Sequence, residues 1–522
     1  MKRTRQWAAR LATVVVGLVM MIGMVGAGGA QAASGQPQPG GSLNVLENSG
    51  DIGAWPQGLD PATNTSEAAT DPYMEAIFGD LFEQGEKGKM IPDLASGYKF
   101  THGGKDLVIS LRKGVTFQDG TPFNAAAVAW NFRRDLDPKN ACSCLTSFPV
   151  SSITTPNSLT VVLHLKEVYA PIVEAFALAA PDFIASPTAF QKMGENAFKI
   201  KPVGAGPFEV VSDTLNSTLA LKKFPHYWQK GHPYLNNLTF TAVGSDQTAY
   251  NAIETGQGQV EQQVPTYAVV QSAMKNPKMT VTTIPGSGTG AIQLNTAIAP
   301  FNNIKAREAI YYATDPEALN KALIKGIGVI SQTGDGPDSL FPDLRVPGYR
   351  TYNLAKAKAL VQQLGGLSFS ITSLAISDLT SEAMQSEYLQ AGMKVTINSV
   401  NLTSLVQAMR NNSWQAVVPG GCGGVDPALG IAGLAWRCIS NGPFSGIHDK
   451  YLDTLINAGT GTVDTEKRGQ IYKNVFAYLS QKAYIPFTYA APFHNISANT
   501  VHGPGITTPL FSPFWEGVWV QH

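Results

Sequence analysis

Strand-like and helix-like segments alternate along the second half of the chain, and this alternation constrains the fold most strongly. Leu367–Ile371 places apolar residues against serines with the period of a strand, Glu382–Gln390 is a predicted helix, and Lys394–Val400 is again a strand. A helix between two strands brings the chain back to its starting edge, so the strands run parallel. We therefore expect a partly parallel α/β sheet in this half.

The first half is richer in strands, which predicts a separate α+β part. Ser42–Glu47, Leu107–Arg112 and Leu159–Leu165 have strand patterns. A helix is predicted over Asp71–Glu83 with Pro72 at its start, and another after Asp119–Pro122, capped by Thr121 or Asn124. Because 522 residues exceed what one hydrophobic core accommodates, we expect two or three lobes.

The N-terminus has the three parts of a secretory signal. Lys2, Arg3, Arg5 and Arg10 form a basic head, Leu11–Ala30 carries no charge, and Ala30-Gln31-Ala32 has the small-x-small form of a cleavage site. We expect residues 1–32 to be removed, although the apolar run is long enough to remain as a membrane anchor. No cysteine precedes Cys142, so the mature protein is expected to be free in a periplasm or secreted, without a lipid anchor.

The formal net charge of the chain is zero, and no long basic stripe interrupts its sequence. Nucleic acid is therefore not an expected partner. Removing the four basic residues of the signal from the 38 in the chain leaves 34 against 38 acidic residues, a net charge of −4.

Four cysteines remain in an exported chain, where disulfides persist: Cys142, Cys144, Cys422 and Cys438. We expect Cys422 to pair with Cys438, which closes a loop of ordinary size. Cys142 and Cys144 are separated by one residue, so a bond between them would be strained. Their spacing does not match a zinc site, and free thiols are the remaining alternative.

Four ordered motifs resemble the family 5 (dipeptide/oligopeptide/nickel-type) extracytoplasmic solute-binding proteins of ABC importers. The likeness covers essentially the whole mature length. The motifs are Pro92–Ala95 with Leu111–Ala125 and Val128; Pro202–Phe208; Asn295-Thr296 with Pro300-Phe301 and Arg307–Asp315; and Tyr352–Leu360. Arg112 and Arg307 within them are expected to hold interlobe or capping contacts, and the Gly204–Pro207 turn to let the backbone bend.

The resemblance implies a mixed α/β fold of the periplasmic-binding-protein class II, of the large three-lobed "cluster C" type, with a ligand cleft between two main lobes. After a flexible leader at 33–41, lobe I would comprise 42–70, 203–288 and 490–522. Lobe II, an extra lobe of the family, would comprise 71–202, and lobe III 289–489. The implied function is delivery of a small, peptide-like or other solute to a membrane permease that has a separate ATPase. The protein would act as a monomer without a cofactor.

Two other functions were weighed against solute import. An exported receptor for a membrane sensor would have the same fold. A secreted hydrolase has little support, because Gly286–Gly290 lacks both the G-x-S-x-G and the G-x-G-x-x-G spacing. The eight histidines are dispersed without a metal-binding pair, so no metal site is expected.

A binding protein needs a cleft lined by aromatic and backbone polar groups. Gly288, Thr289 and Gly290, where lobe I passes into lobe III, are candidates for one rim, with a plain connecting loop as the equal alternative. The segment from Trp414 to Trp436, with Gly423 and Asp426, is the candidate for the other rim.

Gly423 marks a departure from the family pattern. Peptide-binding members carry there an aspartate, three residues before an acid–proline pair, which anchors the ligand's α-amino group; here Asp426-Pro427 is present but Gly423 has no carboxylate. A buried ammonium without a partner binds poorly. We therefore expect a modified or neutral solute (an amide, opine, sugar-like or metallophore molecule), unless a one-residue shift lets Asp426 serve.

Overall fold

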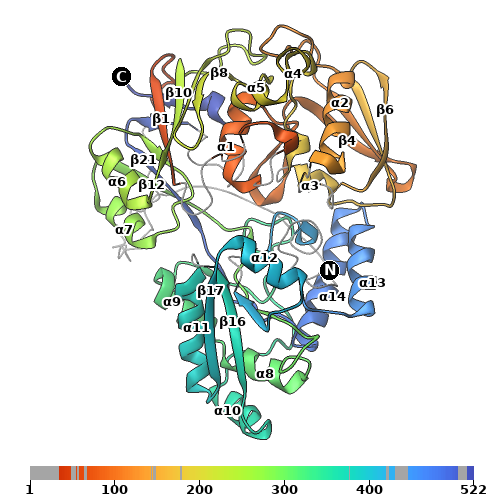
Figure 1. The fold of residues 1–522 in the computed structure, drawn as a ribbon, viewed down its shortest axis with the longest axis vertical. Helices are drawn as coiled ribbons and strands as arrows, with labels where there is room; N and C mark the ends of the chain where they lie inside the picture. Colours follow the sequence, from red (N-terminus) through yellow and green to blue (C-terminus); the bar gives the residue numbers. More distant parts are fainter. Residues whose placement is uncertain are drawn as a thin grey trace, which may run out of the picture. The chain divides into compact units, whose positions relative to one another are not determined.

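The structure, a computed structural model, describes residues 35–48, 55, 58–63, 67–140, 142, 144, 148–176, 179–374, 377–418, 422–429, 445–503 and 514–522. Three larger sheets and four two-stranded ribbons are present in these ranges, with helices around them (Figure 1). We name the parts built on the three sheets lobes I, II and III. The residue boundaries between the lobes stay a prediction.

Lobe I is built on a seven-stranded sheet in the order β12-β21-β11-β1-β10-β9-β8. Its central strand β1 runs parallel to both neighbours, and the outer pairs are antiparallel. Alternate residues Leu43 and Val45 of β1 are buried, as expected for a strand with one face on the core. The strands are β1 (Ser42–Asn48), β8 (Phe208–Thr214), β9 (Thr218–Lys223), β10 (Asn237–Val243), β11 (Val260–Glu261), β12 (Met279–Ile284) and β21 (Phe493–Ala498).

Helices α6 (Asp246–Glu254) and α7 (Tyr267–Lys275) lie beside β12 and β21 of this sheet (Figure 1). The ribbon β22 (Val501–His502) with β23 (Trp519–Val520) adds the C-terminal segment, and Trp515 of the turn before β23 packs on Phe240. Segments far apart in the sequence thus share one core.

Helix α1 (Glu67–Phe78) also packs in the core of lobe I, through Tyr73 and Ile77. The predicted helix Asp71–Glu83 was wrong at both ends, since α1 starts earlier, with Pro72 inside it, and stops before Gly79. Gly79 has φ +66°, a left-handed conformation that commonly ends helices. The residues that follow form the ribbon β2 (Phe82–Gln84) with β3 (Met90–Pro92).

Lobe II is built on an antiparallel four-stranded sheet in the order β4-β5-β7-β6. Helix α2 (Ala125–Asp135) packs against β6 and β7, and the Asn124 side chain accepts a hydrogen bond from the Ala127 amide, so that one of the two predicted caps is confirmed. The strands are β4 (Ala95–Thr101), β5 (Asp106–Leu111), β6 (Val150–Asn157) and β7 (Thr160–Leu165), with the short helix α3 (Ile172–Phe176) packed in their core. Helices α4 (Pro187–Met193) and α5 (Glu195–Ile200) instead place Ala189 and Phe198 in the core of lobe I.

A disulfide joins Cys142 and Cys144, with an S–S distance of 2.15 Å and a Cα–Cα distance of 5.2 Å. The sequence left the fate of these two cysteines open; the structure pairs them, with their Cα atoms within the normal range for a bridge. Cys438 lies outside the described residues, so the pairing of Cys422 with Cys438 stays a prediction.

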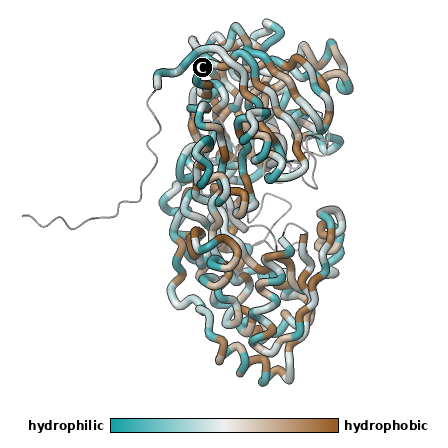
Figure 2. The backbone as a smooth tube through the Cα atoms, turned by 90° about the vertical axis from the view of Figure 1, so that its left-hand side faces the viewer, coloured by the Kyte–Doolittle hydropathy of each residue, from teal (hydrophilic) through white to brown (hydrophobic). Residues whose placement is uncertain are grey.

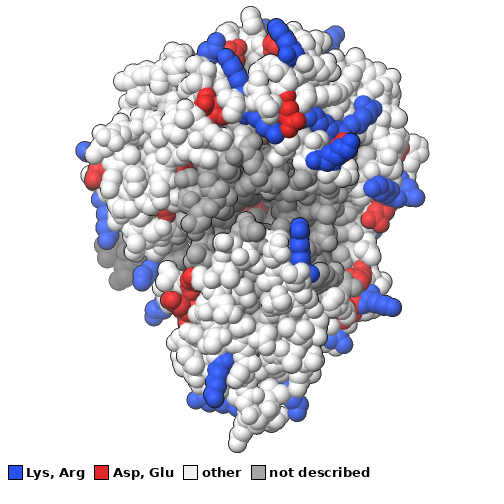
Figure 3. Space-filling model, viewed as in Figure 1, with Lys and Arg blue, Asp and Glu red and all other residues white. Residues whose placement is uncertain are grey.

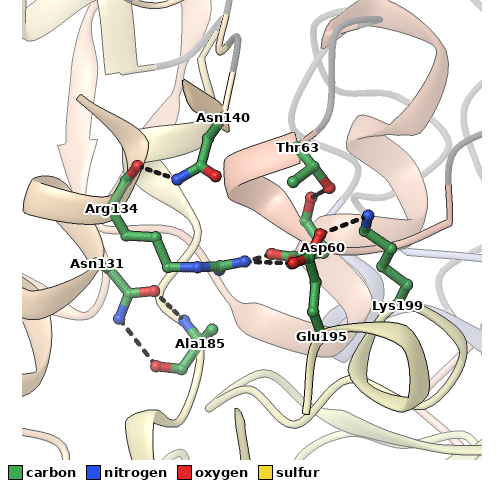
Figure 4. A network of polar contacts seen from close by, with 8 residues as sticks. All are labelled: Asp60, Thr63, Asn131, Arg134, Asn140, Ala185, Glu195 and Lys199. Carbon is green, nitrogen blue, oxygen red and sulfur yellow. Dashed lines mark hydrogen bonds and ion pairs between the residues drawn. The ribbon is translucent and has the colours of Figure 1, made fainter. Parts of the chain in front are cut away.

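A polar network connects lobes I and II where α2 meets the turn at Asp60 (Figure 4). The Arg134 guanidinium donates to both oxygens of the fully buried Asp60 carboxylate and lies 4.0 Å from the Phe190 ring centre. On the same helix, the Asn131 amide exchanges hydrogen bonds of 2.8 and 3.1 Å with the backbone of Ala185. These contacts provide hydrogen-bond partners for buried polar groups at a place where the fold brings together segments that are distant in the sequence.

Lobe III is built on a mixed four-stranded sheet in the order β14-β18-β16-β17. The pairs β16–β17 and β16–β18 are parallel, which confirms the expected partly parallel α/β sheet. The strands are β14 (Gln293–Leu294), β16 (Ser368–Leu374), β17 (Lys394–Val400) and β18 (Ala416–Val418), and the helices near them are α8 (Ile304–Ala313), α9 (Pro316–Ile324), α10 (Leu354–Gln363), α11 (Asp378–Gln390) and α12 (Leu402–Arg410).

Two segments join the sheets of lobes I and III, and they lie side by side. The chain leaves β12 for β14, and it returns through β20 (Tyr489–Ala490) to β21. The Gly290 amide donates to Tyr489 O at 2.9 Å, and the Thr488 amide donates to Gly290 O at 2.8 Å. Strand β20 also pairs with β15 (Val329–Ile330), and the last helices of lobe III, α13 (Lys450–Thr460) and α14 (Thr465–Gln481), pack together.

Apolar and polar residues alternate along most of the described chain (Figure 2), as in proteins whose elements each bury one face. On the face shown in Figure 3, Lys and Arg side chains are scattered among Asp and Glu. Among the described helices, none combines the length and the apolar composition needed to cross a bilayer.

Candidate functional site

Three short segments form a glycine-rich ribbon beside the connection between lobes I and III. Strand β13 (Gly288–Thr289) pairs antiparallel with β19 (Cys422–Gly423), placing Gly288 opposite Gly423. On its other side, Gly288 forms an antiparallel bridge with Asp335. We call Gly286–Thr289, Gly334–Gly336 and Cys422–Gly423 together the glycine ribbon.

Backbone contacts hold the ribbon tightly. The Thr289 amide donates to Gly334 O at 3.1 Å, and its hydroxyl donates to Asp335 O at 2.7 Å. A Cβ added to Gly336 would lie 2.1 Å from Gly286 O, and one added to Gly286 would lie 2.3 Å from Ala491 O. Glycine is therefore required here because backbones approach too closely for any side chain.

Replacing Gly336 with alanine is expected to lower the free energy of unfolding by about 1–3 kcal/mol, the usual cost of forcing extra atoms into a packed site. The backbone of the ribbon must shift to admit the methyl group, so solute binding should weaken too. Gly244→Ala is the control, because a Cβ there would meet nothing within 4 Å. Equal thermal unfolding midpoints for the two variants would contradict the close approach.

Asp335 is the one acidic residue of the ribbon, and its side chain is 2% exposed. Its Oδ1 has no hydrogen-bond partner among the described residues. Burial raises the pKa of Asp335 well above its usual value, and the carboxylates of Asp426 and Asp343 raise it further. Burial and the two neighbouring carboxylates therefore disfavour the charged form of this carboxyl group, and a cation beside it would favour that form.

Gly288, Thr289 and Gly423, predicted for opposite rims, are brought together in the ribbon, and Gly290 bonds to the returning segment at Thr488 and Tyr489. Trp414, in contrast, is buried in an apolar cluster with Leu405, Met409 and Val417. Its ring serves the core of lobe III. Trp436 lies outside the described residues, so its predicted role stays a prediction.

Asp426 forms a buried ion pair with Arg468. Its fully buried carboxylate lies 3.1 Å from Nε of Arg468 on α14, and it also accepts a hydrogen bond from the Ala428 amide at 2.8 Å. Nη2 of Arg468 lies 3.0 Å from Glu174 on α3 of lobe II. Burial raises the pKa of Asp426, and Arg468 opposes that rise. The carboxylate is thus already paired, which disfavours a direct role as the amine anchor.

Sequence reasoning missed Asp335, which was passed over within a Gly/Pro-rich stretch. The pattern Gly334-Asp335-Gly336 was a usable signal, because glycines on both sides of a single polar residue indicate close backbone approach. No sequence pattern, however, reports that Asp335 lies opposite Gly288.

A separate hollow of about 650 Å³ lies on lobe III among α8, α13 and α14. Its cation Arg350 is already bonded to Glu308 at 2.8 Å and to the carbonyl oxygen of Ser480. The lining comes from 312–350 and 451–481 and includes no residue of the glycine ribbon. We therefore place the candidate site at the ribbon.

The fold is shared with solved binding proteins. The agropinic acid complex of the periplasmic binding protein AgaA from A. tumefacien R10 superimposes with a TM-score of 0.74 at 24% identity, covering 92% of this chain and 99% of that one. Helicobacter pylori DppA, solved with the peptide STSA, gives 0.77 at 20% identity, covering 93% and 99%. These likenesses define a periplasmic-binding-protein fold.

The chain belongs to the bacterial extracellular solute-binding proteins, family 5, whose model matches residues 89–441. It is similar to the glutathione-binding protein GsiB of Salmonella choleraesuis (strain SC-B67), with 30% identity over 355 residues that cover 66% of this chain and 67% of the relative. The protein is therefore the extracytoplasmic solute-binding component of an ABC importer and not an enzyme.

Proposed function

We propose that the solute lies in a cleft between lobes I and III whose floor includes the glycine ribbon. One observation carries this proposal: Gly288 of the segment leaving lobe I pairs with Gly423 of lobe III, and Asp335 flanks them. A buried acidic side chain beside glycines, at the junction of two lobes, is the kind of polar group that a small-molecule site contains. Gly288, Thr289, Gly290, Gly423 and, within the undescribed part, Trp436 are the residues assigned to it.

Closure of the lobes would deliver the solute to the permease. Only two chain segments join the sheets of lobes I and III in the described residues, at Gly290 and Thr488–Tyr489, and adjacent segments can act as a hinge. The solute must bind the closed form better than the open form to shift the equilibrium. We propose that the mature chain, cleaved after residue 32, works as a monomer.

The solute is proposed to be peptide-like or derived from an amino acid, but not a peptide held by its α-amino group at the Gly423 position. GsiB is a glutathione-binding protein, and the solved structures hold an opine-type acid and a tetrapeptide. Gly423 supplies no carboxylate, and Asp426 is paired with Arg468.

Native mass spectrometry of the purified full chain tests the proposal. We expect one small molecule per protein to be retained, released on denaturation and identified by its mass. Protein that carries no molecule and gains none from a lysate of low-molecular-weight solutes would contradict solute binding. A carried dimer mass would contradict the monomer.

A further inference from the structure

The three strands of the glycine ribbon place one acidic side chain beside two positions that have none. Residues directly opposite each other in an antiparallel pair direct their side chains to the same face. Asp335 is opposite Gly288, and Gly288 is opposite Gly423, so one face of the ribbon carries a single side chain next to two bare glycines. Neither of the two positions beside Asp335 on this face therefore carries a side chain.

The carboxyl group of Asp335 has no internal use in the described structure. Its backbone carbonyl oxygen already accepts two hydrogen bonds, from the Thr289 and Ser331 hydroxyls at 2.7 and 2.9 Å. Its side-chain Oδ1 has no partner among the described residues, although the residue is 2% exposed. Buried carboxyl groups without partners destabilise a fold, so such a residue is retained for a ligand or another function.

Among the described residues, no ion pair reaches Asp335, and the cation beside the neighbouring Asp426 has other partners. Arg468 is committed to Asp426 and Glu174, which lie 3.1 and 3.0 Å from its nitrogens. Asp343 is paired with Lys473 at 2.9 Å. Asp426 and Asp343 thus each lie in an ion pair, whereas Asp335 forms none with the residues that the structure describes.

We propose that Asp335 receives the cationic N–H group, an ammonium or guanidinium, of the imported solute, in place of an aspartate at the Gly423 position. This inference rests on the proposed function. Asp335 and Gly423 lie on opposite sides of Gly288, so their backbones are separated by two strand spacings, about 10 Å. The positive group of the solute is accordingly bound about two strand spacings from the place where a carboxylate at position 423 would hold it.

A cation site at Asp335 would explain how a chain with glycine at position 423 still recognises a positively charged solute. An N–H cation at Asp335 would donate a hydrogen bond to the unpaired oxygen and favour ionisation of the carboxyl group, giving a charge-assisted hydrogen bond. Solutes that lack a cation would leave this group buried and uncompensated.

Matched probes test the inference on the full mature protein, first freed of any carried solute by unfolding and refolding. Reduced glutathione, Ser-Thr-Ser-Ala and arginine are each compared with their Nα-acetylated forms by calorimetry. For glutathione and the tetrapeptide, acetylation removes the only cation. We expect at least one of these two to bind about 100-fold more tightly than its acetylated form. Arginine keeps its guanidinium and reports which of its two cations is recognised.

Asp335→Asn should abolish the preference for the charged probe, because the amide has nearly the same shape and no charge. Asp343→Asn is the matched control, removing a neighbouring carboxylate outside the ribbon, and it should keep the preference. The thermal unfolding midpoint of unliganded Asp335→Asn should equal or exceed that of the wild type, which shows that the variant folds.

Three results overturn the inference: a preference for charged probes that persists in Asp335→Asn, equal binding of charged and acetylated forms by the wild type, or no binding of any charged probe. A failed proposed function looks different, because native mass spectrometry would then find no carried solute of any kind.

Discussion

Replacing Arg468 with methionine is expected to lower the free energy of unfolding by about 3–5 kcal/mol, the usual cost of removing one partner from a buried ion pair. Arg468 is 2% exposed and connects α14 to Asp426 and, across to lobe II, to Glu174. Methionine fills a similar volume, so the loss measures charge more than packing. Two buried carboxyl groups would remain without a cation.

The matched control is Lys467→Met, one residue earlier on the same helix. The side chain of Lys467 is 77% exposed and lies 3.5 Å from Asp464, a surface contact that contributes little. Thermal and urea unfolding should separate the two variants clearly. Arg468→Met with the midpoint of the wild type would show that the network does not stabilise the contact between lobes II and III.

Acidification from about pH 8 to about pH 5 is expected to stabilise the protein, because several buried carboxyl groups keep their protons when folded. Burial raises the pKa of Glu47 to about 8 and that of Asp93 to about 8, and burial with the nearby Asp246 raises the pKa of Glu261 to about 10. In the unfolded chain the pKa values of these groups are near their ordinary values of 4.5 or 3.8. The folded state therefore binds more protons throughout this window.

Stability then falls as the pH rises, by at most about 1.4 kcal/mol per pH unit for each such group, until the folded group also ionises. The thermal unfolding midpoint should accordingly be several degrees higher near pH 5 than near pH 8. Glu261→Gln should flatten the dependence, whereas Glu382→Gln, at an exposed position on α11, should leave its slope unchanged. A midpoint that rises toward pH 8 would contradict these protonation states.

Local patterns predicted local structure well. The strand Lys394–Val400 has the predicted bounds, and Asn124 caps α2. Arg307 makes the kind of capping contact expected of it, since it donates to Phe301 O at 2.7 Å and to Lys482 O at the end of α14 at 3.0 Å. In each case the deciding residues are close in sequence or repeat with a regular period.

Contacts between distant segments could not be predicted in the same way. The Gly204–Pro207 turn was expected to let the backbone bend, and the chain does bend at 205–207; the sequence did not show that a Cβ at Gly204 would lie 2.3 Å from Ile77 O of α1. Trp414 was predicted to line the binding cleft because it is aromatic, but its ring packs in the apolar core of lobe III. Asp335 belongs to the candidate site only because it forms a bridge with Gly288. One sequence taken alone does not reveal that pairing.

The strand order of lobe I bears on how an exported chain matures. Strand β21, at 493–498, lies between β12 and β11, and it is the single neighbour of β12 in the described sheet. When a chain crosses a membrane from its N-terminus, β12 emerges roughly two hundred residues before its partner, since it ends at Ile284. The sheet cannot be completed until nearly the whole polypeptide has been translocated. A chain whose translocation stops before roughly its last thirty residues therefore cannot complete this sheet and does not reach the mature fold.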